Sequence, residues 1–577
     1  MKKKLLPALI VTGLIILVVI IMGITALINK YTPTKKTEDL KEYFNISSDD
    51  EAALIVNNEL SDYKAKIIDK KIYVDYKFVH DSLNSRFYWD ANENVLLYTT
   101  ASDIISAAAD SNSYSVTKQT NDFGYPIVKA TSDSALIALD YVKQYSNITF
   151  KSYDDPARIV ITSKWDEIDS ATVSKSTQVR VKGGIKSPIL KEVKKDDKIT
   201  ILDSGDKWDK VATEDGVIGY IKRKALSESK KTKLTNPDYE EETFTHIKKD
   251  KDICLAWNQV TSQSANSKVP QVISSTKGIN VMSPTWFYLN DNNGNLADIA
   301  SKDYVSYCHS QGIEVWGLFS NLENTDVDAA YVLTHTSTRT TLINQIMSAA
   351  FNYELDGVNI DFENITEAAY GDSYIEFIRE LSIKCHNNGI SLSVDVTVPA
   401  SFNKFFNRSD MAKFADYIVI MGYDEHYKGS DAGSVSSIPW VTEGVESTLK
   451  EVPADQIILG MPFYTRIWEL TPKDDDDAVT DTEDQSKYTV ASQVYSMDAA
   501  AAQLATNNAT AALDEKSGQN YAEWSASNKL YKVWLEDSTS LEKRLKLVDD
   551  NKLAGAAFWK LGFENSSVWD TVIKYLD

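Results

Sequence analysis

The stretch LDGVNIDFEN, Leu355 to Asn364, sets acidic residues into an apolar strand pattern. Successive side chains of an extended strand point to opposite faces. One face of this stretch is apolar, and the other carries Asn359, Asp361 and Glu363. Burial of an unpaired carboxylate is costly, so a strand with a purely structural role would not carry this row. The pattern therefore predicts a buried strand whose polar face serves a function.

Seven other apolar segments around this stretch read as buried strands. In four of the eight, a glycine begins the strand after a helix-like stretch, as is typical of a helix C-terminus followed by a buried parallel strand. The eight segments are DICLAW, GINVMSP, GIEVWGL, GVNIDFE, GISLSVDV, DYIVIMGY, QIILGMPFY and LAGAAFWKLG. Eight strand–helix units within residues 245–577 predict an α/β fold, a (β/α)8 TIM barrel.

The segment between the last two predicted strands, 464–553, is too long for a single helix. It predicts an inserted α+β subdomain that forms one wall of a cleft. Its acidic run KDDDDAVTDTED, residues 473–484, is expected to be a solvated loop.

Catalytic residues of TIM barrels lie at the C-terminal ends of the strands. This rule places Glu363 at the barrel mouth and Asp361 just beneath it. Two carboxylates this close on one strand face push their pKa values apart, so that one can act as an acid while its neighbour stays ionised. The alternative interpretation is an acidic strand end that is simply solvated.

The segment LDGVNIDFE resembles the DGxDxDxE motif of family 18 glycoside hydrolases, the chitinase family. Three more segments agree in order: MGYD (421–424), GMPFYTRIW (460–468) and GAAFWKLG, which contains Trp559. SPTWFYL, KVWLED and AGAAFWKLGFE are closer to a bacterial branch that includes spore-cortex and peptidoglycan N-acetylglucosaminidases. The resemblance covers about residues 245–577 and implies a retaining hydrolase of N-acetylglucosamine-containing glycan.

The resemblance also implies a mechanism in which the N-acetyl oxygen of the substrate attacks the anomeric carbon. Glu363 then matches the general acid that protonates the leaving oxygen and later activates water. Asp361 matches the carboxylate that orients the acetamide and stabilises the oxazolinium-like intermediate. Tyr423 matches the hydroxyl that hydrogen-bonds the acetamide carbonyl.

Further residues are implied as substrate-binding. Met421, Asp424 and Trp559 match the floor and walls of the sugar subsite, and Arg466 is a further candidate for substrate contact. Asn359 stands where many chitinases carry Asp. An asparagine can donate a hydrogen bond but cannot titrate, so a shifted pH optimum or slower turnover is expected rather than inactivity.

Two small domains are predicted before the barrel. Residues 46–170 contain a weak repeat offset by 63 residues, and its first copy resembles the copper amine oxidase N-terminal-like domain, an α+β fold for which the sequence supplies no copper ligands. Short alternating strands in residues 173–228 predict a small β-barrel that resembles bacterial SH3-like domains. Its excess of basic residues favours either contact with an anionic wall polymer or a plain spacer. Residues 31–45 and 229–244 read as linkers.

The N-terminus begins with three lysines followed by an uncharged run, Leu5 to Ile28, long enough to cross a bilayer. No small-residue cleavage site follows, which favours an uncleaved signal-anchor over residues 1–30 and a single-pass membrane protein with an extracellular catalytic domain. A Gram-positive-type cell surface is the expected location. Secretion after cleavage and the opposite orientation are the alternatives.

Bulk composition excludes several classes of partner. A formal net charge of -22 argues against nucleic-acid binding. Three cysteines without CxxC spacing and six scattered histidines indicate no disulfide framework, no metal site and no cofactor. The expected partner is an N-acetylated polysaccharide, either peptidoglycan or chitin-like. A chitinase and a non-catalytic surface glycan-binding protein are the alternative functions, and endo or exo action and the oligomeric state stay open.

Overall fold

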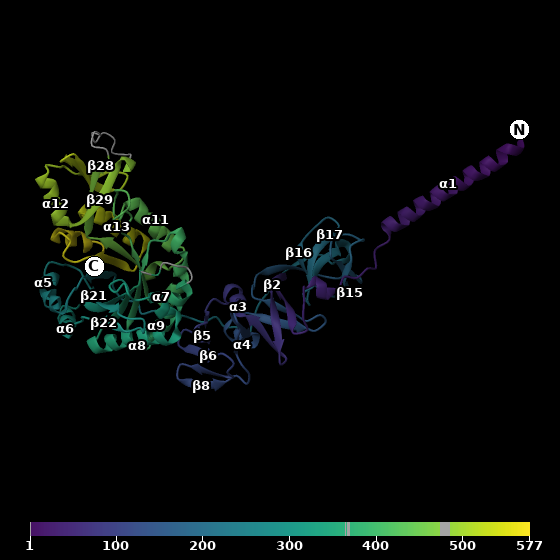
Figure 1. The fold of residues 1–577 in the computed structure, drawn as a ribbon, viewed down its shortest axis with the longest axis horizontal. Helices are drawn as coiled ribbons and strands as arrows, with labels where there is room; N and C mark the ends of the chain where they lie inside the picture. The colour runs from purple at the N-terminus through teal and green to yellow at the C-terminus, as the bar shows by residue number, and fades with distance from the viewer. Residues whose placement is uncertain (1, 364, 366–369, 474–484, 577) are drawn as a thin grey trace. The chain divides into compact units, whose positions relative to one another are not determined.

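The computed structural model of the chain describes residues 2–363, 365, 370–473 and 485–576 (Figure 1). The chain forms two compact units. The first comprises Met1–Trp89, Ala107–Tyr114 and Asn121–Glu241, and the second comprises Asp90–Ser106, Ser115–Thr120 and Glu242–Asp577.

The second unit contains a closed ring of eight parallel strands. In chain order these are β20 (Ile253–Asn258), β21 (Val281–Leu289), β23 (Glu314–Ser320), β24 (Gly357–Asp361), β25 (Ser391–Thr397), β26 (Tyr417–Met421), β27 (Ile457–Pro462) and β33 (Gly555–Trp559). Each strand pairs with the next barrel strand along the chain, and β27 pairs with β33 although the insert separates them in sequence. β20 pairs with both β33 and β21 and so closes the ring. The eight predicted strands and the TIM barrel are confirmed. A short strand, β22 (Leu296–Asp298), adds an antiparallel edge to β21.

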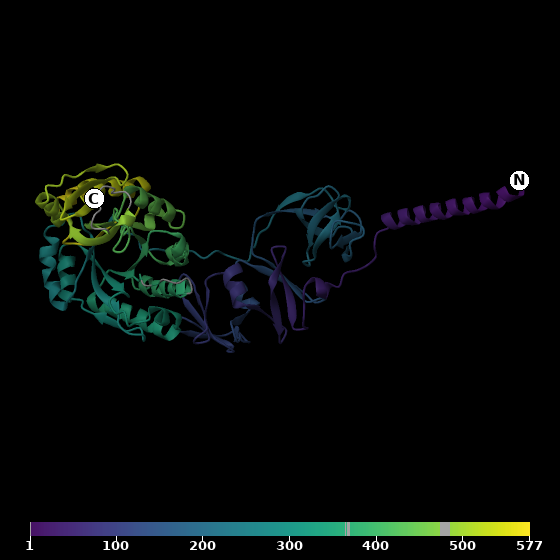
Figure 2. The same cartoon turned by 45° about the horizontal axis from the view of Figure 1, so that its top comes forward.

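Helices surround the ring (Figures 1 and 2). They are α5 (Val269–Ile273), α6 (Lys302–Ser310), α7 (Ala329–Thr334), α8 (Thr336–Tyr353), α9 (Gly371–His386), α10 (Arg408–Phe414), α11 (Ile438–Thr448), α13 (Ser538–Asn551) and α14 (Trp569–Val572). The larger apolar core lies between strands and helices and includes Val358, Ile360 and Phe362 of the signature stretch. A second cluster, which includes Leu255, Trp257, Leu318, Val419 and Ala557, fills the ring.

Alternation along β24 therefore sends its apolar residues toward the helices and its polar residues into the ring. Gly357 at the start of this strand permits a close approach, because a β-carbon there would lie 2.5 Å from Cδ1 of Trp316. This packing fixes the register of the polar row above it.

The predicted insert is present between β27 and α13. Its sheet has the strand order β29-β28-β32-β31-β30, with α12 beside it. The elements are β28 (Tyr464–Pro472), β29 (Tyr488–Ser496), α12 (Met497–Thr506), β30 (Ala512–Asp514), β31 (Gln519–Ala526) and β32 (Lys529–Leu535). The α+β character of the insert is confirmed, whereas most of its acidic run, 474–484, lies outside the described residues.

The segment Asp90–Ser106 belongs to the same compact unit as the barrel. Oδ2 of Asp90 accepts hydrogen bonds from the backbone N–H of Thr336 at 2.7 Å and from its Oγ1 at 2.6 Å, at the start of α8. Oγ1 of Thr99 donates to Oε1 of Glu376 on α9 at 3.0 Å, and both residues are fully buried. The unit that holds the barrel thus reaches beyond residues 245–577.

A seven-stranded sheet in the N-terminal half has the order β11-β12-β1-β2-β3-β10-β9. Its strands are β1 (Glu51–Val56), β2 (Glu59–Ile68), β3 (Lys71–Asp75), β9 (Val128–Ala130), β10 (Ala135–Ala138), β11 (Thr149–Tyr153) and β12 (Arg158–Thr162). Helix α3 (Tyr76–Ser82) follows β3 as α4 (Leu139–Tyr145) follows β10. A strand pair follows each helix, β4 (Phe87–Asp90) and β5 (Val95–Thr99) in one copy and β11 and β12 in the other. The two halves of the sequence repeat therefore share one element order.

Two further antiparallel sheets lie near this one in the chain. One has the order β4-β5-β6-β7-β8, formed by Phe87–Asp90, Val95–Thr99, Ile104–Ala108, Ser113–Val116 and Gln119–Asp122. The other has the order β15-β14-β18-β17-β16-β13-β19, formed by β13 (Glu167–Thr172), β14 (Thr177–Arg180), β15 (Ile189–Val193), β16 (Lys198–Asp203), β17 (Trp208–Thr213), β18 (Ile218–Lys222) and β19 (Lys230–Lys233). The strands expected in residues 173–228 are present, and the resemblance to SH3-like domains stays a prediction.

Helix α1 (Lys2–Tyr31) precedes a short helix α2 (Leu40–Tyr43). Residues Leu9–Tyr31 of α1 are long and apolar enough to cross a membrane, and a signal sequence has the same properties. The signal-anchor therefore stays a prediction.

Candidate active site

Two acidic residues mark the C-terminal end of β24. Asp361 is the last residue of the strand and is half-buried, while Glu363 follows it and is exposed. The fold thus sets Glu363 at the mouth of the barrel and Asp361 one step inside. Residues 364 and 366–369, which come next, lie outside the described residues.

Asp361 carries an unsatisfied oxygen. Its Oδ1 is buried and has no hydrogen-bond partner among the described residues. Burial, and then the negative charges of Asp395, Glu363 and Glu323, raise the pKa of Asp361 well above its ordinary value. Buried polar atoms are normally paired, so this oxygen indicates a position where a ligand supplies the partner.

The surroundings of Glu363 favour the protonated form of its carboxyl group. The protein around its carboxyl group removes part of its hydration, and the charges of Asp424 and Glu323 add to this, so the pKa of Glu363 is raised. A glutamate at a barrel mouth with a raised pKa can donate a proton near neutral pH.

Tyr423 follows β26 and is half-buried at the same end of the ring. Its ring packs edge-on against Trp257, with centroids 6.4 Å apart, and against Tyr464, at 6.3 Å. Burial, followed by the charges of Asp361, Asp395 and Glu363, raises the pKa of Tyr423 well above 10.0. Its hydroxyl therefore stays protonated and available as a donor.

Removal of this donor is expected to slow the chemistry. Tyr423→Phe keeps the ring in its aromatic contacts and deletes only the hydroxyl. Loss of one donor to a group that gains charge in the transition state costs about 10²–10³-fold in kcat. Steady-state kinetics on a chitooligosaccharide measures this, and a kcat within a factor of two of wild type would show that the hydroxyl makes no such contact.

The insert supplies two further side chains. The hydroxyl of Tyr464 donates to Oδ1 of Asp424 at 2.5 Å, and Nη2 of Arg466 lies 3.7 Å from the same oxygen. Nε of Arg466 is buried without a partner among the described residues. Arg466 thus lies beside Asp424, whose backbone adopts a left-handed φ of 60°.

Trp559 and Met421 end their own strands. Trp559 ends β33 and packs edge-on against Trp257 at 6.0 Å. Met421 ends β26 and is buried. Trp559, Tyr423 and Trp257 therefore form one aromatic cluster at the C-terminal end of the ring.

Asn359 lies below Asp361 and is fully buried. Its amide nitrogen donates to Oδ1 of Asp395 at 2.7 Å and to Oγ of Ser393 at 3.1 Å. The carbonyl oxygen of its side chain accepts from the indole of Trp257 at 3.0 Å. Asn359 lies on the polar row that the strand pattern predicted, but the sequence did not single out Asp395 or Tyr464 as site residues. The alternation SLSVDVT in β25, which repeats the pattern of β24, is the signal that identifies Asp395.

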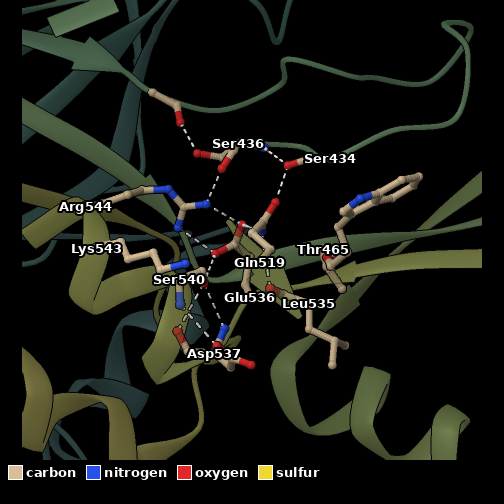
Figure 3. Close-up of polar contacts among 12 residues, drawn as sticks. Ser434, Ser436, Thr465, Gln519, Leu535, Glu536, Asp537, Ser540, Lys543 and Arg544 are labelled. Atoms are coloured by element: carbon tan, nitrogen blue, oxygen red, sulfur yellow. Dashed lines mark hydrogen bonds and ion pairs between the residues drawn. The ribbon is translucent and has the colours of Figure 1, made fainter. Parts of the chain in front are cut away.

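A buried polar network fastens the insert to the barrel (Figure 3). Arg544 on α13 binds both carboxylate oxygens of Glu536, at 2.7 and 2.9 Å, and also donates to the backbone carbonyl of Ser436. Nε2 of Gln519 on β31 donates to Glu536 at 2.7 Å. Oγ of Ser436 donates to the carbonyl oxygen of Gly422 at 2.5 Å, so the network reaches the residue before Tyr423.

Comparison with known proteins agrees with this geometry. Residues 324–564 match the model of glycosyl hydrolases family 18. The "Uncharacterized glycosylase YvbX" of Bacillus subtilis is 24% identical over 299 residues, 49% of this chain and 81% of that protein. The "Cortical fragment-lytic enzyme" of the same organism is 25% identical over 287 residues, 48% of this chain, and the match spans 63% of that protein, less than two thirds of its length.

Among solved structures, the C-terminal domain of a proposed chitinase from Desulfitobacterium hafniense shares the fold. It superposes with a TM-score of 0.51 at 19% identity, over 57% of this chain and 100% of that domain. Residues 324–564, which include Asp361 and Glu363, thus form a domain that matches glycosyl hydrolases family 18, and this match supports the chain as a glycoside hydrolase.

Proposed function

We propose that the protein is a retaining hydrolase that cleaves β-1,4 bonds of N-acetylglucosamine-containing cell-wall glycan, with peptidoglycan as its substrate. Catalysis is substrate-assisted, so the acetamide of the substrate takes the place of a protein nucleophile. The similarity to a cortical fragment-lytic enzyme favours peptidoglycan over chitin as the class of glycan.

The unpartnered oxygen of Asp361 is the observation that supports this proposal most strongly. An acetamide N–H bound there would satisfy it, and the adjacent Tyr423 hydroxyl would donate to the acetamide carbonyl. These two contacts would hold the carbonyl oxygen against the anomeric carbon. Orientation of this kind replaces a collision between two molecules by a step within one complex.

Glu363 completes the reaction. It donates its proton to the glycosidic oxygen as the acetamide oxygen bonds to the anomeric carbon, which gives an oxazolinium ion and a free sugar hydroxyl. The ionised Glu363 then takes a proton from water, and that water opens the oxazolinium ion. The product keeps the β configuration because the anomeric carbon is inverted twice.

The N-terminal region would hold the enzyme at its substrate. The proposed location is the outer face of the cell membrane, with helix α1 as a single-pass anchor. The domains of residues 46–170 and 173–228 come between this anchor and the barrel in the sequence, and the basic surplus of the second suits contact with an anionic wall polymer.

Product analysis tests the substrate. The full chain in detergent is incubated with purified peptidoglycan and, in parallel, with chitooligosaccharides, and the products are identified by mass spectrometry. The proposal expects new reducing N-acetylated ends from peptidoglycan at a higher kcat/KM than from chitin. The full chain is used because the unit that holds the barrel includes residues 90–106.

Two alternatives predict different products. A chitinase would release chitobiose-type fragments and leave peptidoglycan uncut. A glycan-binding protein would bind both polymers in a pull-down and release no reducing ends from either.

A further inference from the structure

Asp395 is a buried carboxylate inside the barrel, on the strand next to the one that carries Asp361. Leu392, Val394 and Val396 of β25 face the helices, so Asp395 faces the interior of the ring, where it is 3% exposed. The parallel register pairs Asn359 with Ser393. Two residues farther along both strands, Asp361 and Asp395 are neighbours on the same face.

Hydrogen bonds fix the orientation of Asn359 toward Asp395. The indole N–H of Trp257 can only donate, so the atom of Asn359 that it contacts must be the oxygen. Oγ of Ser283 donates to the same oxygen at 3.0 Å. The amide nitrogen of Asn359 is therefore directed at Asp395 and Ser393, and it cannot be turned away without loss of the bond to Trp257.

Asp395 has no balancing cation in the part of the chain that the structure describes. Among the described residues it makes no ion pair, and its hydrogen-bond donor is the neutral amide of Asn359. Burial, with the charge of Glu363 adding to it, raises the pKa of Asp395 well above 3.8 even though the bond from Asn359 lowers it. Two adjacent carboxyl groups without a cation resist ionising together, because the charge of one raises the pKa of the other.

We propose that Asp395 is a positioning residue that shares one proton with Asp361. It supplies, from the neighbouring strand, the titratable carboxylate that the chain lacks at Asn359. The proton moves from Asp361 to Asp395 when Asp361 must be the anion beside the oxazolinium ion, and it returns after the product leaves. The charge of the pair stays at minus one throughout, so the step needs no further reactant.

Among the described residues, the other ionisable groups that face this pair come from four parts of the barrel. Glu363 follows β24, Glu323 follows β23, Tyr374 lies on α9 and Tyr423 follows β26. None of them carries a positive charge, so the proton within the pair is the means by which its repulsion is reduced. This inference rests on the proposed function, because the acetamide is the group toward which Asp361 is oriented.

Asp395→Asn tests the role of the charge. Asparagine has the same shape, and its side-chain oxygen can still accept from Asn359, so the packing and that bond are kept. We expect kcat to fall about 10²-fold at nearly constant KM, as for a misplaced catalytic group. The negative charge that the pair shared is then fixed on Asp361, which couples to Glu363, so the pKa of Glu363 rises and the alkaline limb of the kcat/KM profile moves to higher pH.

The same variant has an opposite effect on stability. The pKa of Asp395 is higher in the fold than in the unfolded chain, so its contribution to stability is present at acid pH and is lost as pH rises. Asparagine does not titrate, so Asp395→Asn avoids the stability that wild type loses as pH rises. The thermal midpoint of the variant at neutral pH is therefore expected to be higher than that of wild type. A variant that is more stable and less active has lost a functional group rather than a structural one.

The exchange variant Asn359→Asp with Asp395→Asn provides the rescue. It returns the carboxylate to the pair on the other side of the same hydrogen bond, where Trp257 and Ser283 remain donors. We expect kcat within about tenfold of wild type, one order better than Asp395→Asn alone. The alkaline limb of its pH profile should return toward that of wild type.

The outcomes separate this proposal from the proposed function. Turnover of peptidoglycan or a chitooligosaccharide by wild type is measured first, and its absence overturns the proposed function. Where wild type is active, a wild-type kcat and pH profile in Asp395→Asn overturn the role of Asp395. So does a folded exchange variant that is no more active than Asp395→Asn.

Discussion

Glu363→Gln is expected to reduce kcat on glycan by about 10²–10⁴-fold while leaving glycan binding intact. Glutamine fills the same space at the barrel mouth but carries no proton that it can transfer to the glycosidic oxygen. The loss should be smaller for an aryl glycoside, because a phenolate leaving group needs little protonation. Steady-state kinetics on both substrates, with a pull-down on insoluble glycan for binding, measures the contrast.

The dependence of activity on pH tests the role of Glu363 in a second way. Activity requires Glu363 to be protonated, and the pKa of Glu363 is raised, so the alkaline limb of the wild-type profile should lie above the ordinary range of a glutamate. Glu443→Gln on the exposed face of α11 is the matched control and should behave as wild type. Equal losses for natural and aryl substrates would contradict the role of Glu363 as the proton donor.

Arg544→Met is expected to destabilise the barrel unit by about 3–5 kcal/mol. Arg544 is fully buried and Glu536 is 3% exposed, so removal of the arginine leaves a carboxylate in the interior without its partner. The insert would lose its attachment to Ser436, and with it the support beneath Gly422 and Tyr423. Calorimetry of the full chain should show the transition of this unit at lower temperature, with reduced kcat below that transition.

Two control variants show whether the loss of stability in Arg544→Met comes from the unpaired buried charge. Lys552→Met breaks an ion pair with Asp549 whose side chains are 79% and 57% exposed, and it should cost at most about 1 kcal/mol. Arg544→Met combined with Glu536→Met removes both buried charges and should recover most of the stability. A double variant as unstable as the single one would show that shape, and not the unpaired charge, determines the cost.

The sequence predicted the barrel because its signals are local. Each strand–helix unit can be recognised within about ten residues from a glycine, a run of Val and Ile and a helical period. Eight such units in succession are compatible with few folds other than a TIM barrel. The pair Asp361 and Glu363 was predicted for the same reason, since strand alternation alone sets both on one face. The repeat of a helix and a strand pair, with Phe78–Thr99 aligned to Tyr141–Thr162, was also predicted from aligned residues.

The missed features depend on contacts between distant residues. Asp90 binds the start of α8 at Thr336, and no pattern near either residue indicates that pairing. Asp395 was not predicted because a single acidic residue in a strand does not indicate a site by itself. Its significance depends on the neighbouring Asp361 of β24, which the sequence of β25 does not reveal. The hydrogen bond from Trp257 that orients Asn359 joins β20 to β24. These two strands come within reach of each other only when the ring is closed.

Substrate assistance is tested most directly by weakening the nucleophile in the substrate. The full chain is assayed on 4-nitrophenyl glycosides of chitobiose whose acetamide at the cleaved sugar carries no, one, two or three fluorine atoms. If the acetamide oxygen attacks the anomeric carbon, kcat/KM falls steeply with each fluorine, since each withdraws electron density from that oxygen. A series that is cleaved at equal rates would contradict the account, because the nucleophile would then belong to the protein or to water.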